Sequence, residues 1–182
     1  MGNFKDLLLK RQSDRKYSSK KVEEEKILSC LEAGRLSPSA CNSQPWSFVV
    51  IDQEPVLQQA QKRIATMGMN RFVKQAPVLI AIVLEKANLT ASLGSVIKDK
   101  EYPLLDIGIA ANNICMQAAE LGLGSCILGW FDEKGLKQLL DVPESKRIPL
   151  VIALGYPTTV TRNKIRKPMK EIIYFNSYKS KR

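Results

Sequence analysis

Two runs of consecutive apolar residues constrain the fold of this chain more than any other feature of its sequence. Residues 77–84 read PVLIAIVL and residues 149–156 read PLVIALGY. A strand with one face in water alternates apolar and polar residues, whereas an unbroken apolar run of this length is typical of a strand buried on both faces. The two runs therefore predict a central sheet with helices packed on both sides, in the α/β or the α+β class.

Helical and strand patterns alternate around these runs, with no internal repeat, so the 182 residues predict a single domain. The longest helical pattern, residues 102–124, is apolar around most of its circumference and rich in Gly and Ala. It predicts a central core helix, the seam of a dimer, or both. Residues 85–102 show no clear period and are interpreted as a mobile lid or an insertion. The other expected elements are helices at 4–11, 21–35, 54–67 and 132–140, and short strands at 47–52 and 125–128.

The net charge of +10 is concentrated near the C-terminal end of the chain. Residues 162–182 hold eight Lys or Arg and one Glu, together with the run IIYF at 172–175, which we interpret as an extended packing segment. A phosphate-binding cluster plus solvated lysines accounts for this charge, so nucleic-acid binding through the tail is the less favoured hypothesis.

Cysteine and histidine usage excludes several classes of site. The chain has no histidine, and its four cysteines form no C-x-x-C pair, so a zinc site is not expected. Cys30 and Cys115 fall on apolar helical faces and are expected to be buried. The chain shows neither a signal-peptide pattern nor a run of 18 apolar residues, so a cytoplasmic protein outside the membrane is expected.

Two polar segments near the start of the chain predict a binding site. Residues 11–15 read RQSDR and offer two guanidinium groups and a hydroxyl, a combination that suits a phosphate. Residues 38–46 read PSACNSQPW, a turn-rich run dense in amide, hydroxyl and backbone donors, which suits a flat heterocycle with polar edges. Together they predict a site for a phosphorylated ring cofactor, which would carry chemistry that the side chains of this histidine-free chain do not supply.

With these motifs the chain resembles the FMN-dependent nitroreductase family over nearly its whole length. The matching features are the R-x-S-x-R start, the P-S-x-x-N-x-Q-P-W segment, the 106–124 helix ending in L-G-L-G, Gly129-Trp130, and the basic pair Lys164 and Arg166 before Pro168. The resemblance implies an α+β fold with a central mixed sheet flanked by helices on both faces. It also implies an interlocked homodimer that binds two FMN molecules at its interface.

The resemblance assigns roles to individual residues. Arg11, Ser13 and Arg15 would meet the ribityl phosphate and the pyrimidine side of the flavin, and Lys164 or Arg166 would join the phosphate contacts. Pro38, Ser39 and Asn42 would come from the other subunit, and Gly129 would offer backbone contact near the reactive edge of the ring. The full set of expected cofactor-binding residues is Arg11, Gln12, Ser13, Arg15, Pro38, Ser39, Asn42, Gln44, Leu128, Gly129, Lys164 and Arg166.

The implied activity is hydride transfer from NADH or NADPH through FMN to a nitroaromatic, a quinone or a similar conjugated acceptor, with no catalytic side chain required. Leu128 stands where several family members have a glutamate, which keeps open the alternative of an FMN-binding storage or regulatory protein. The 84–102 segment is short beside that of larger members, which implies an open pocket.

Trp46 is expected to be a core anchor, while Trp130 and Phe131 either line a substrate slot or pack. The 103–123 helix is expected to form the dimer core, so that Asp at Ala111 or Ile114 dissociates or unfolds the protein, and residues 171–175 are expected to reach across to the partner.

Overall fold

A four-stranded antiparallel sheet forms the centre of the molecule in the computed structural model, which describes residues 3–66, 68–86 and 101–179. The strand order is β1-β2-β4-β3, with β1 at Trp46–Ile51, β2 at Val78–Leu84, β3 at Gly124–Leu128 and β4 at Arg147–Gly155. The two apolar runs are the central strands β2 and β4, which pair in antiparallel register with Ile80 opposite Ile152. The expected lid or insertion lies almost entirely outside the described residues.

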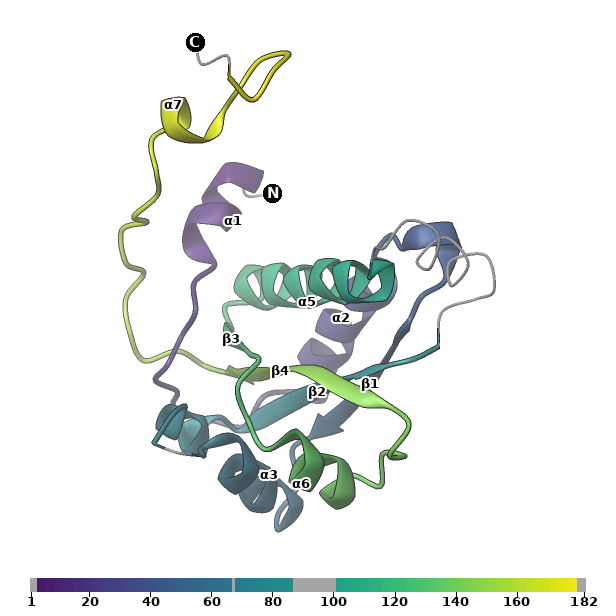
Figure 1. Cartoon of the computed structure of the whole chain (residues 1–182). Helices are drawn as coiled ribbons and strands as arrows, with labels where there is room; N and C mark the ends of the chain where they lie inside the picture. Colours follow the sequence, from purple (N-terminus) through teal and green to yellow (C-terminus); the bar gives the residue numbers. More distant parts are fainter. Residues whose placement is uncertain (1–2, 67, 87–100, 180–182) are drawn as a thin grey trace.

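Helices cover both faces of this sheet, which explains the unbroken apolar runs (Figure 1). On β2, Leu79 and Ala81 belong to one core cluster and Val78 and Ile80 to the other. Alternate residues of a strand point to opposite faces, so a strand covered on both sides is apolar at every position. The α+β class is thereby confirmed.

The expectation of a mixed sheet is wrong for the described residues. All three strand pairings are antiparallel, and the one parallel contact is an isolated bridge between Ser13 and Ser125. The apolar runs could not reveal this, because burial on both faces gives the same sequence pattern whichever way the neighbouring strand runs.

The helices form two layers. The first layer is α2 with α5, whose buried residues include Cys30 and Cys115. Trp46 of β1 is buried in the same cluster, so all three residues lie in the core as expected. The second layer is α3 with α6, which share the other cluster. The helix bounds are α1 Phe4–Lys10, α2 Glu24–Arg35, α3 Val56–Ile64, α5 Tyr102–Glu120, α6 Glu133–Leu139 and α7 Met169–Ile172, with the 3-10 turns η1 at Ala40–Asn42 and η2 at Arg71–Gln75.

Helix α5 is a core helix with one outward apolar face. Ala111 and Ile114 are fully buried against the sheet, so neither side chain is available to a second subunit, and Asp at either position is expected to unfold the chain rather than only dissociate it. The exposed apolar residues of α5 are Leu104, Leu105 and Ile109. These, and not the two buried residues, are in a position to contact a partner.

The two ends of the described chain leave the body on the α5 side (Figure 1). Helix α1 presents Phe4, Leu8 and Leu9 to solvent, and α7 presents Met169 and Ile172. Residues 169–172 form helix α7. The segment expected to be extended at 172–175 is therefore helical at its first residue, Ile172. No helix within the described ranges is long and apolar enough to cross a membrane.

Candidate functional site

The first polar motif runs along the free edge of β3. The Asp14 N–H donates to the Ser125 carbonyl at 3.0 Å, and the Tyr17 hydroxyl donates to the Asp14 carbonyl at 2.8 Å. These bonds fix residues 12–14 against the sheet, because a buried backbone group in a folded chain requires a partner. Arg11 and Arg15 flank the fixed stretch, and the Arg15 guanidinium lies over the Phe72 ring with 5.9 Å between its Cζ and the ring centroid.

A C-terminal strap, residues 157–166, returns over this motif. The Arg162 Nη2 donates to the Ser13 carbonyl at 2.9 Å, and the Lys164 Nζ donates to the Arg11 carbonyl. Further along, the Thr158 N–H donates to the Lys16 carbonyl at 3.2 Å. Segments about 150 residues apart in sequence are thereby held side by side.

Between the motif and the strap lies a hollow of about 350 Å³. Five cationic side chains line it, and no carboxylate is among the described residues that do. The lining residues are Arg11, Gln12, Ser13, Arg15, Arg162, Asn163, Lys164, Ile165 and Arg166. The structure thus brings together the first motif and the late basic pair, as the sequence predicted, and adds Arg162 and Asn163.

The electrostatics of the hollow favour an anion. Partial burial lowers the pKa of Lys164, and the positive charges of Arg166, Arg11 and Arg162 lower it further. The Arg11 Nε is buried and has no hydrogen-bond partner among the described residues. A buried donor without a partner is costly in free energy, and Arg11 is also one of the residues that line the hollow. A phosphate dianion fits this donor set, since it brings several acceptor oxygens and neutralises repelling cations.

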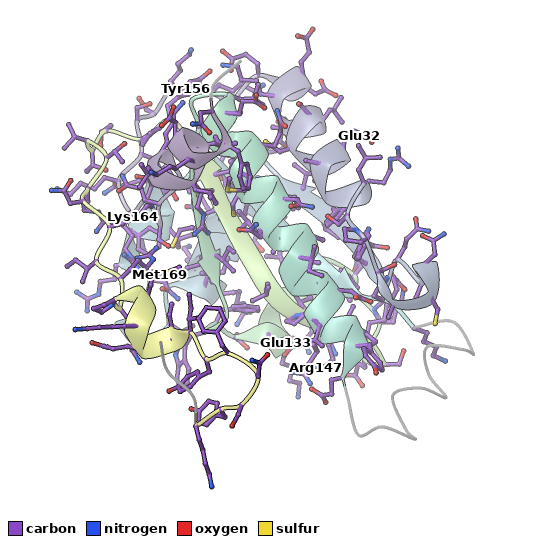
Figure 2. All side chains as sticks on the ribbon, turned by 90° about the horizontal axis from the view of Figure 1, so that it is seen from above. Glu32, Glu133, Arg147, Tyr156, Lys164 and Met169 are labelled. Atoms are coloured by element: carbon purple, nitrogen blue, oxygen red, sulfur yellow. The ribbon has the colours of Figure 1, made fainter. Side chains whose placement is uncertain are left out.

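Figure 2 shows Lys164 on the strap at one side of α5, with Glu32 of α2 at the other.

The second polar motif, residues 38–46, belongs to another part of the molecule, near the start of α5. There the Ala40 N–H donates to the buried Asp106 carboxylate at 3.1 Å. Ser37, which precedes the motif, accepts at 2.8 Å from the Nδ2 of Asn113, in the second half of α5. Ala119, further along α5, lines the same small pocket as Arg11. An α-helix rises 1.5 Å per residue, so Asp106 and Ala119 are about 20 Å apart along the helix axis. Within one chain, therefore, the two motifs do not share a pocket.

The 38–44 turn holds an unusual backbone conformation. Cys41, Asn42 and Gln44 all have positive φ, at 52°, 51° and 47°, a region that residues with a side chain seldom adopt. The Gln44 N–H donates to the Ser39 hydroxyl at 2.9 Å, and the Gln44 side-chain amide donates to the Asn42 carbonyl at 3.2 Å. Clusters of such conformations occur at ligand clamps, where the surrounding structure maintains them.

The end of β3 carries the remaining expected residues. The Leu128 side chain is buried in the core under α3 and α6, so that only its backbone can face a ligand. Gly129 and Trp130 are exposed, Trp130 by 61%, and the Asn70 side-chain amide donates to the Trp130 carbonyl at 2.7 Å. Phe131 packs against the core, so of the two aromatic residues only Trp130 is free to line a slot.

Two features of the site escaped the sequence reasoning. Gln12 lines the hollow, but it is largely buried and its side-chain amide bonds to the protein, which its place in the RQSDR run does not indicate. Arg162 was seen only as part of the basic tail, although the alternation Arg162, Lys164, Arg166 places every second residue on one side of an extended segment. The structure describes no group of three or more cysteines and carboxylates that could hold a metal ion.

Comparisons with known proteins point to one family. A family model described as the nitroreductase family matches residues 8–156. The oxygen-insensitive NADPH nitroreductase of Helicobacter pylori is 28% identical over 189 residues, which cover 86% of this chain and 86% of that protein.

Solved structures show the same likeness. An FMN-dependent nitroreductase from Clostridium difficile is 30% identical, with a TM-score of 0.79 over 94% of this chain and 98% of its own. The NADPH:FMN oxidoreductase of Vibrio harveyi, solved in complex with NAD+, has a TM-score of 0.80 over 97% of this chain and 78% of its own. At 20% identity the latter supports the fold alone.

Proposed function

Because the chain belongs to the nitroreductase family, we propose that it is an FMN-dependent oxidoreductase that uses NADH or NADPH to reduce a nitroaromatic, a quinone or a similar conjugated acceptor. The observation that carries the proposal is the hollow between the first motif and the strap. Five cations line it, among them Arg11, whose buried Nε lacks a partner among the described residues, and such a set of donors suits a phosphate.

In this proposal Arg11, Arg15, Lys164 and Arg166 hold the phosphate of FMN. The Ser13 hydroxyl lies in the same hollow and supplies a neutral donor. Bound FMN supplies the hydride-transfer chemistry, which suits a chain without histidine. The protein's part is to bind the cofactor tightly and to leave one face of its ring open to both substrates in turn.

The ring would extend from the phosphate toward the end of β3, where Gly129 exposes its backbone and Trp130 its side chain. The 38–44 turn lies too far away in the same chain, so we propose that a second copy supplies Pro38, Ser39, Asn42 and Gln44. A homodimer is further supported by the apolar side chains that α1, α5 and α7 expose on one side of the molecule. A large exposed apolar surface is characteristic of an interaction surface.

A visible absorption spectrum tests the proposal. Purified protein, as isolated or after addition of FMN, is expected to show the two flavin bands, which bleach under argon with NADPH or NADH and return with a quinone or a nitroaromatic. Initial rates should follow ping-pong kinetics, because donor and acceptor use the same face of the ring in turn. Protein that takes up no FMN refutes the proposal, and flavin that neither nicotinamide bleaches favours a storage or regulatory role.

A further inference from the structure

Gln12 uses every hydrogen-bonding position of its side-chain amide. Its Oε1 accepts from the Arg162 N–H at 3.1 Å and from the Arg162 Nε at 3.3 Å. Its Nε2 donates to the Asp14 Oδ1 at 2.8 Å and to the Val160 carbonyl at 3.2 Å. An amide has two acceptor sites and two donor hydrogens, so none is left for a ligand. Gln12 therefore serves the protein's own structure, although it borders the cationic hollow.

The partners of Gln12 permit one orientation of the amide. A backbone N–H such as that of Arg162 can only donate and the Val160 carbonyl can only accept, while the Asp14 Oδ1 accepts from the amide. A flipped amide would place donor against donor and acceptor against acceptor on both sides. Three of the four bonds go to Val160 and Arg162, and so to the strap that carries Lys164 and Arg166.

Asp14 connects Gln12 to the sheet. Its N–H is bonded to Ser125 of β3, and its carboxylate lies over Gly124, where a Cβ atom would come within 2.8 Å of the Asp14 Oδ2. A side chain at position 124 would thus displace the carboxylate that orients Gln12. The connection runs from the edge of β3 through Asp14 and Gln12 to the strap, and most of it is buried.

From this geometry we infer that Gln12 and Asp14 are positioning residues, which hold the strap so that Lys164 and Arg166 meet the phosphate beside Arg11. The inference rests on the proposed function for the identity of the anion, but the positioning of the strap can be measured without any ligand. It assigns Gln12 a role distinct from cofactor contact. It also explains why a carboxylate is buried behind a cluster of cations, where burial raises its pKa despite the hydrogen bond from Gln12.

The test uses Gln12→Met, which keeps the length of the side chain and its neutral charge but removes all four bonds. Gln59→Met, at an exposed position of α3, is the matched control. The first measurement is the rate at which trypsin cleaves FMN-free protein after Lys164 and Arg166, followed by mass spectrometry. The second is the dissociation constant of FMN and of riboflavin, which lacks the phosphate.

We expect cleavage within the strap to become about tenfold faster in Gln12→Met, and FMN to bind about tenfold more weakly, a change of about 1.4 kcal/mol. Riboflavin affinity and the control variant should match the wild type. Gly124→Ala, which alters no residue of the hollow or strap, should shift both measurements in the same direction, and it carries the test if Gln12→Met does not fold.

The outcomes separate the inference from the proposed function. If wild-type protein binds no FMN, the proposed function fails, whereas faster cleavage in Gln12→Met still supports the positioning of the strap. Unchanged cleavage in both variants overturns the inference. Faster cleavage with unchanged FMN affinity also overturns it, because the strap would then not position the phosphate contacts.

Discussion

Arg11 is the residue on which the proposed site depends most. Its Nε is buried without a partner among the described residues. Its carbonyl accepts from Lys164, so Arg11 both lines the hollow and connects the first motif to the strap. Arginine offers two parallel donors to a phosphate, which the single ammonium of lysine does not reproduce.

Arg11→Ala is therefore expected to weaken FMN binding about tenfold to a hundredfold, the range for hydrogen bonds to a charged group. Riboflavin should bind with unchanged affinity, because it has no phosphate. Fluorescence titration measures both constants, and Arg35→Ala on α2 removes the same charge away from the hollow as a control. Equal losses for FMN and riboflavin would show that Arg11 does not contact the phosphate.

The lowered pKa of Lys164 predicts a pH dependence of binding. Burial and the neighbouring Arg166, Arg11 and Arg162 lower this pKa in the protein alone, whereas a bound phosphate would raise it. Above the pKa of Lys164 in the free protein, FMN binding therefore requires the uptake of a proton by Lys164. FMN affinity should be constant below that pKa and should fall as the pH rises through it.

Lys164→Arg provides the comparison, because a guanidinium stays charged over this range. Titrations of both proteins with FMN between neutral and alkaline pH are expected to diverge, with the weaker affinity at high pH in the wild type. Any titration of the ligand itself is common to the two curves. Curves that coincide at every pH would mean that Lys164 is not close to the bound phosphate.

At the residue scale, the sequence predicted the chemistry of the site better than its internal bonding. Arg11, Arg15, Lys164 and Arg166 were assigned to one anion site, and the structure brings all four to one hollow. The roles of Gln12 and Asp14 depend on long-range contacts with the strap and with β3, which leave no periodic signal in the chain. Three-dimensional proximity was needed to identify them.

At the scale of elements, strand and helix signals were reliable where local physical chemistry decides them. The helix from Asp132 illustrates this. The Asp132 carboxylate accepts from the Gly135 N–H at 2.9 Å and so caps α6, where the sequence predicted a helix at 132–140. The direction of strand pairing was not predictable in the same way, because β2 and residues 148–155 of β4 are apolar on both faces, whichever way the neighbouring strand runs.

Asp132→Ala is expected to lower the free energy of unfolding by about 1 kcal/mol, the usual cost of losing an N-cap. The Arg63–Asp132 ion pair, at 3.1 Å, is too exposed to add much. Asp132→Asn keeps an acceptor oxygen for the Gly135 N–H and should lose clearly less. Urea denaturation measures the difference, and equal losses in the two variants would attribute the effect to charge instead of capping.

At the scale of the whole molecule, the apolar side chains that α1, α5 and α7 expose are one basis of the proposed homodimer. Phe4 is 68% exposed and Ile109 40% exposed, and their helices stand on the same side of the sheet (Figure 1). The sequence identified α5 as a helix of unusual composition. It did not distinguish the residues facing the sheet from those facing outward, because both faces are apolar.

This distinction gives a direct prediction for the proposed dimer. Ile109→Asp should yield folded monomers that have lost FMN, because the charge lies on the outward face of α5. Ala111→Asp should unfold the chain, since Ala111 is fully buried. Sedimentation velocity and circular dichroism measure the two outcomes, and a folded Ile109→Asp dimer with its flavin would place the interface elsewhere.

The central claim is that each FMN lies between the hollow of one protomer and the 38–44 turn of its partner, and subunit mixing tests it most directly. Arg11→Ala damages the hollow, and Asn42→Ala combined with Ser39→Ala damages the turn, so each variant alone should bind little FMN. After co-expression, half of the dimers are mixed, and each mixed dimer has one intact site, so bound FMN should recover to about a quarter of the wild-type level. A mixture that binds no more FMN than its parents would contradict the shared site.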